Sequence, residues 1–71
     1  MACINPDGTL SGTALLLLRI ILNPLTPEEI AAQIGIPLFR IRSSLRELVA
    51  AGLVIADGVQ YIISETGKTK V

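Results

Sequence analysis

The residues best suited to bind another molecule are basic, and they cluster in the middle of the chain. Of the six Lys and Arg residues, three fall within seven positions and two stand near the end: Arg40, Arg42, Arg46, Lys68 and Lys70. Guanidinium groups donate several hydrogen bonds to anions such as phosphate. The formal net charge is zero, so the overall charge that drives strong non-specific binding to phosphate is absent. The sequence therefore indicates a local basic patch on a neutral chain.

The residues that enzymes and metal sites need are largely missing. The chain contains no histidine and a single cysteine, Cys3. It has no glycine-rich phosphate loop and no metal-ligand cluster, and its acidic residues fall at expected helix caps, turns and exposed helix faces. Cys3 stands near one end of the chain and is interpreted as incidental and not as a nucleophile. We therefore expect no catalysis, no cofactor and no bound metal.

Length and composition favour one small domain built mainly from helices. A chain of 71 residues buries only about 60% of its unfolded surface and is marginal without support. One cysteine cannot form an internal disulfide, so oligomerisation is the support that remains. The composition is 51% apolar but only 3% aromatic, so the core must be aliphatic, which suits packed helices. We expect one domain over residues 1–71.

The first third of the chain predicts a turn and then a helix. Asn5-Pro6-Asp7-Gly8 is typical of a tight turn, which makes residues 1–9 an N-terminal turn segment. Thr9 or Ser11 can then cap a helix from about Leu10 to Leu22. Asn23-Pro24 ends this helix, because the residue before a proline avoids the helical region.

The second and third helices have clearer signals. Thr26-Pro27-Glu28-Glu29 forms a capping box with proline at the first helical position, and predicts a helix from Pro27 to about Ile34 that Gly35 ends. Pro37 opens the next helix and Gly52 ends it. Its apolar residues recur with the helical period: Leu38, Ile41, Leu45, Leu48 and Val49.

After Gly52 the pattern changes from helical to extended. Asp57-Gly58 lies between two apolar runs, Leu53 to Ala56 and Val59 to Ile63, and predicts a β-hairpin with a two-residue turn. Residues 64–71 have too few apolar side chains to bury and are predicted to form a frayed tail.

We expect neither a membrane span nor a targeting segment. The apolar run from Leu15 to Leu22 is short and is interrupted by Arg19, whereas a bilayer span needs about 20 apolar residues. A lone cysteine is compatible with a reducing compartment, and we expect a cytoplasmic protein.

A winged helix-turn-helix contains two helices joined by a short glycine-containing turn, and a hairpin follows them. The expected elements of this chain have the same order. The residues that fit this pattern are Thr26 to Ala31, Gly35-Ile36-Pro37, Ile41, Leu45, Leu48 and Gly52-Leu53-Val54, followed by Tyr61 to Gly67. The chain thus resembles winged-helix transcription regulators of the MarR and ArsR kind. The resemblance implies a mainly α (α+β) fold with three helices and a short two-stranded wing, and a DNA-binding function in transcription regulation.

In those regulators the third helix enters the major groove. Spacing residues by 100° puts Phe39, Arg42, Ser43 and Arg46 opposite the apolar side, with Arg40 on the flank. The resemblance therefore implies a set of candidate DNA-binding residues: Phe39, Arg40, Arg42, Ser43, Arg46 and Lys68. The alternative is that the arginines only solubilise the helix. Three roles remain for Phe39: packing in the core, contact with a thymine methyl group, or contact with a protein partner.

The expected wing departs from the DNA-binding pattern. Its turn is short, its tip carries Asp57, and its strands contain no Lys or Arg, so it cannot reach into a minor groove as basic wings do. Lys68 and Lys70 replace the missing positive charge of the wing only if they contact DNA. The alternative is that they are solvated lysines near the end of the chain. The alternative function is therefore a winged-helix module that binds protein without strong DNA binding.

The first helix has more apolar surface than one packing face requires. A helix buried on one side needs a stripe about 100° wide, whereas here apolar residues surround a single Arg19. We expect a homodimer whose interface contains Leu15, Leu17, Leu18, Ile21 and Leu22. The alternative is that the hairpin and the N-terminal segment cover both faces within the monomer.

Overall fold

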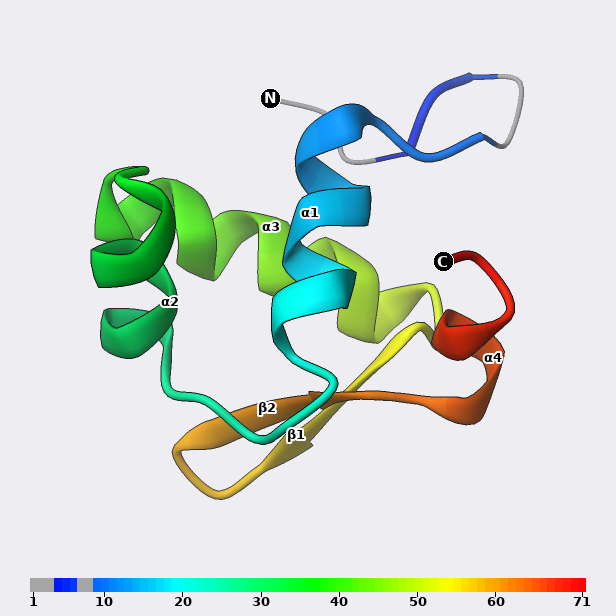
Figure 1. The fold of residues 1–71 in the computed structure, drawn as a ribbon. Coiled ribbons are helices and arrows are strands. Elements are labelled where there is room, and N and C mark those ends of the chain that lie inside the picture. The colour runs from blue at the N-terminus through cyan, green and yellow to red at the C-terminus, as the bar shows by residue number, and fades with distance from the viewer. Residues whose placement is uncertain (1–3, 7–8) are drawn as a thin grey trace.

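The computed structural model describes residues 4–6 and 9–71. Our expectations for Cys3 and for the Asp7-Gly8 part of the first turn lie outside the described residues. The elements follow one another in the order α1 (Gly12–Ile20), α2 (Pro27–Ile34), α3 (Leu38–Ala50), β1 (Val54–Asp57), β2 (Gln60–Ile63) and α4 (Glu65–Lys68) (Figure 1). The predicted order of three helices and a hairpin is confirmed, so the chain is a small α+β protein.

Helix α1 is shorter than predicted at both ends. Ser11, and not Thr9, caps it, because the Ser11 hydroxyl accepts a hydrogen bond from the Ala14 amide at 3.1 Å. Leu10 instead forms an isolated β-bridge with Ile4. At the other end the Ile21 carbonyl accepts from the Ile63 amide of β2 at 3.0 Å. Bonds to extended segments therefore replace the helical bonds that the local pattern predicted.

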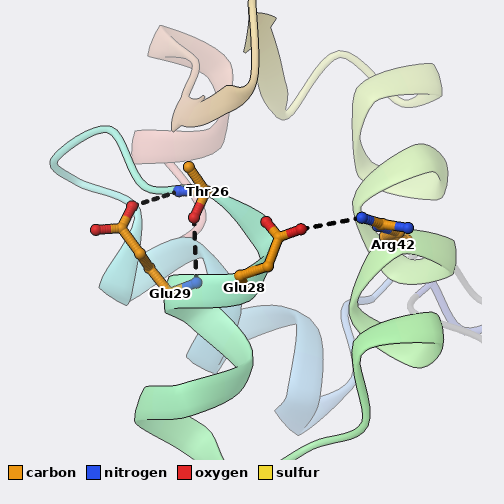
Figure 2. Close-up of polar contacts among 4 residues, drawn as sticks. All are labelled: Thr26, Glu28, Glu29 and Arg42. Carbon is orange, nitrogen blue, oxygen red and sulfur yellow. Dashed lines mark hydrogen bonds and ion pairs between the residues drawn. The ribbon is translucent and has the colours of Figure 1, made fainter.

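Helices α2 and α3 begin and end close to the predicted positions. The capping box is present: the Glu29 amide donates to the Thr26 hydroxyl at 3.2 Å, and the Thr26 amide donates to the Glu29 carboxylate at 2.9 Å (Figure 2). Gly35 ends α2 in the left-handed conformation, with φ of 72°. Pro37 precedes α3, and its carbonyl accepts from the Arg40 and Ile41 amides.

The hairpin turn lies one residue later than predicted. Asp57 pairs with Gln60 as the last rung of the ladder, so the two turn residues are Gly58 and Val59. Gly58 has φ of 62°, and a positive φ at the first turn position is what a type II′ turn requires of glycine. On the other edge of β2, Leu25 and Tyr61 exchange two backbone hydrogen bonds of 3.1 and 2.7 Å. The segment between α1 and α2 thus adds a single rung to the sheet.

The prediction of a frayed tail is wrong for the residues that follow β2. Ser64 caps α4: its hydroxyl accepts from the Gly67 amide at 2.9 Å and donates to the Gly52 carbonyl at 2.6 Å. Gly67 is buried against the Leu53 carbonyl, where a Cβ atom would overlap the oxygen. The small number of apolar side chains in residues 64–71 did not predict this helix, because backbone contacts and a serine hydroxyl hold it in place.

The core is aliphatic, as the composition predicted, and every helix except α4 contributes side chains to it. Its buried residues are Ala14, Leu17, Leu18, Ile21, Ile30, Ile41, Leu45, Leu48, Leu53, Val54 and Ile63. Within the described residues, no helix is both long enough and apolar enough to cross a bilayer.

The burial of α1 corrects the expected dimer interface. Leu17, Leu18 and Ile21 are fully buried within one chain, so they cannot form an intermolecular surface and the expectation is wrong for these three residues. Leu15 is half-buried, and Leu22 is 50% exposed. The hairpin and α3 complete the core on the inner side of α1, which leaves a narrower apolar surface than the sequence suggested.

Candidate nucleic-acid interface

Helix α3 separates a buried side from an exposed side, as its periodicity predicted. Ile41, Leu45 and Leu48 are buried in the core, together with Ser44, which the apolar pattern did not identify. The candidate residues of this helix all lie on the solvent side: Phe39, Arg40, Arg42, Ser43 and Arg46. The structure therefore brings five of the six candidate DNA-binding residues together on one helix.

Phe39 stands out among the exposed residues of α3. It is the second residue of the helix and is 73% exposed. The alternative in which Phe39 packs into the core is therefore wrong. A hollow of about 110 Å³ beside it is lined by Phe39, Arg40, Ser43 and Ser44. The hollow thus brings Phe39 together with Arg40 and two serines in the amino-terminal half of α3.

The elements around α3 hold it from the inside and leave its outer side uncovered. α3 packs against α2 and β1, and Ile30 of α2 lies in the same core as Ile41 of α3. The Leu53 amide, just before β1, donates to the Leu48 carbonyl at 2.9 Å. These contacts fix the helix, and the exposed residues of its solvent face stay available to a partner.

Arg42 already has an acidic partner, which the sequence did not predict. Its guanidinium donates a 3.0 Å hydrogen bond to the Glu28 carboxylate in the first turn of α2 (Figure 2). The two side chains remain 56% and 60% exposed, and such exposed pairs contribute about 0.2–1 kcal/mol. A local pattern could not reveal this pair, because 14 positions separate its members.

The other basic candidates differ in their surroundings. Among the described residues, Arg40 and Arg46 form no ion pair. Lys68 lies on α4 and its ammonium group contacts the Glu65 carboxylate at 3.3 Å. In Figure 1, α4 lies at the end of the hairpin away from α2, so the structure does not bring Lys68 to the arginine face.

The hairpin turn lies on the same side of the molecule as Arg42. A hollow of about 380 Å³ is lined by residues from α3, the start of α2 and the hairpin: Thr26, Pro27, Glu28, Arg42, Gly58, Val59 and Tyr61. Glu28 places negative charge next to Arg42 in this hollow. The electrostatic character of this hollow is therefore mixed, because one arginine faces one carboxylate.

The described residues hold no group of three or more His, Cys, Asp or Glu side chains that could bind a metal ion. No family model, curated protein or solved structure matches the chain. The geometry of the chain itself therefore supplies the basis for a function.

Proposed function

We propose that the chain is a winged helix-turn-helix module that binds duplex DNA through α3 in the major groove and regulates transcription. The observation that carries this proposal is the exposed row of donors Arg42, Ser43 and Arg46 on a helix whose other side is fixed in the core. An α-helix fits the major groove, and arginine pairs with guanine or with phosphate there. The residues of the amino-terminal half of such a helix contact base edges.

The arrangement of the remaining elements supports the same function. In a winged helix-turn-helix, the helix before the turn packs across the recognition helix and a hairpin follows it. Here α2 packs against α3, Gly35 makes the turn, and β1 and β2 follow directly. The β-bridge between Leu25 and Tyr61 joins the segment before α2 to the hairpin. As a result, α2, α3 and the hairpin turn keep a fixed relative position.

The Arg42–Glu28 ion pair is compatible with DNA binding. Breaking an exposed pair of this kind costs about 0.2–1 kcal/mol, whereas a bidentate contact with a base contributes about 1–3 kcal/mol of discrimination. Arg42 can therefore exchange its carboxylate partner for DNA with a net gain. Arg46 has no such competitor among the described residues and is expected to contribute more to affinity.

The proposal can be tested by titrating fluorescent duplex DNA with Arg46→Ala, Arg42→Ala and Arg19→Ala variants across a salt series. Arg19 is exposed on α1, so Arg19→Ala removes the same charge away from α3. We expect the two α3 variants to weaken binding, and a lost phosphate contact to lower the salt slope by about 1. Equal weakening by Arg19→Ala, or no binding of any duplex at low salt, would refute the proposal.

The alternative function is a protein-binding module, and the exposed apolar side chains favour it. Phe39 on α3 is 73% exposed, and Val59 in the hairpin turn is 75% exposed. The zero net charge and the Glu28 carboxylate paired with Arg42 also favour protein binding. Absence of DNA binding at low salt, with a stably folded protein, would establish this alternative as the leading one.

We further propose that the module acts as a homodimer without catalysis or a cofactor. The apolar surface that remains at α1 and just after it includes Leu16, which is 41% exposed, Leu22 and the half-buried Leu15. A charged side chain placed in this surface would oppose association because it would have to be desolvated. Sedimentation equilibrium should therefore show weaker association for Leu22→Glu than for wild type. A wild-type chain that stays monomeric at millimolar concentration would refute the homodimer.

A further inference from the structure

We propose that Phe39 and Ser43 together read thymine, through the C5 methyl group and the adjacent O4 atom of that base. This inference rests on the proposed binding of duplex DNA by α3. It starts from an exposed phenyl ring at the second position of a helix whose solvent face also carries the hydrogen-bond donors Arg42, Ser43 and Arg46. A phenyl ring neither donates nor accepts hydrogen bonds of ordinary strength, so it needs an apolar group as its partner.

The base edges in the major groove offer a single kind of apolar group. Guanine, cytosine and adenine present hydrogen-bonding atoms there and carry no methyl group, whereas thymine presents its C5 methyl group beside O4. A phenyl ring placed on the other edges would desolvate polar atoms without replacing their hydrogen bonds, which is unfavourable. Thymine is therefore the base whose edge matches an aromatic side chain.

The geometry of α3 supplies the second half of the contact. Phe39 and Ser43 are four positions apart, so they are neighbours on one face of the helix, with Cβ atoms about 5–6 Å apart. Both line the hollow of about 110 Å³ at the amino end of α3. Thymine carries its methyl group and O4 on adjacent ring carbons, so the methyl can contact Phe39 while the Ser43 hydroxyl donates to O4. Arg42 and Arg46 on the same face remain available for guanine or phosphate.

The experiment removes the methyl group from the DNA without altering the protein. An alternating adenine–thymine duplex of about 20 base pairs is compared with the same duplex containing uracil, which keeps O4 and lacks only the methyl group. Loss of one buried methyl-sized contact corresponds to about a fourfold weaker affinity. We therefore expect wild type to bind the thymine duplex about four times more tightly, and Phe39→Ala to bind both duplexes equally.

Ser43→Ala and Val71→Ala serve as matched variants. Ser43→Ala should weaken binding to both duplexes and preserve the fourfold ratio, because uracil and thymine share O4. Val71→Ala, which trims an exposed apolar side chain after α4, should change neither affinity nor ratio. Phe39 is exposed, so Phe39→Ala should fold normally, which circular dichroism can verify.

Each remaining outcome has a definite meaning. If wild type binds both duplexes measurably and with equal affinity, the proposed recognition of thymine is overturned. The proposed DNA-binding function would still stand. A ratio that persists in Phe39→Ala would also overturn it, since the preference would then come from the shape of the DNA. Failure of the wild type to bind either duplex at low salt would refute the proposed function itself, and this inference with it.

Discussion

The guanidinium of Arg42 on α3 lies 3.0 Å from the carboxylate of Glu28 in the first turn of α2. This ion pair joins the two helices on the side of the molecule that also carries the hairpin turn. Glu28 consequently has two roles. It fits the positive end of the α2 dipole, and it competes with any phosphate that approaches Arg42.

Removing that competitor should strengthen DNA binding. We predict that Glu28→Gln increases duplex affinity several-fold, because it frees Arg42 and removes one negative charge near the phosphates. Stability should fall by no more than about 1 kcal/mol, since the pair is exposed. Glu65→Gln on α4 makes the same change in net charge away from α3, and fluorescence anisotropy should show a smaller effect for it. Equal gains in both variants would indicate that only net charge matters.

Gly67 is predicted to be a position that accepts no side chain. A Cβ atom there would overlap the Leu53 carbonyl oxygen and lie 2.7 Å from Ile63 Cγ1. Because backbone cannot move aside cheaply, Gly67→Ala should destabilise the fold by about 2 kcal/mol or more, as overpacked sites do. Gly12 in the first turn of α1 has no atom within 4 Å of such a Cβ. Gly12→Ala should therefore be neutral or stabilise by up to about 1 kcal/mol. Urea denaturation of both variants measures the contrast.

Ser64 is predicted to contribute more to stability than any exposed serine. Its hydroxyl caps α4 through the Gly67 amide and also donates to the Gly52 carbonyl. Ser64→Ala removes both bonds in a buried setting and should cost about 1–2 kcal/mol. Ser43→Ala, at an exposed position on α3, should stay within about 0.5 kcal/mol of wild type. Similar denaturation midpoints for the two variants would contradict the structural role of α4.

The two sides of α1 should respond differently to truncation. Leu17 is fully buried, whereas Leu16 is 41% exposed. Leu17→Ala should destabilise the monomer by about 2–5 kcal/mol, because it leaves a cavity in the core. Leu16→Ala should cost less than about 1 kcal/mol. Thermal unfolding at two protein concentrations separates this effect on the fold from any effect on association, since only the latter depends on concentration.

The limits of α2 could be predicted closely because they depend on neighbouring residues. The Thr26 to Glu29 capping box and the left-handed Gly35 act within one helical turn, so the sequence itself carries the signal. The limits of α1 and the position of the hairpin turn could not be predicted to the residue. They depend on Ile63 bonding to Ile21 and on Asp57 pairing with Gln60, and the local pattern allows either of two registers.

The sequence by itself determined the order of the three helices and the hairpin, the aliphatic core and the solvent face of α3. Each of these follows from local caps or from a periodic pattern, which act over a few residues. Only the tertiary structure decided that Glu28 pairs with Arg42, that Leu17 faces the core and not a second chain, and that Ser64 and Gly67 fix a fourth helix against Leu53. These features depend on which distant segments meet. A periodic pattern shows that a side chain is apolar, but it cannot show which surface covers it.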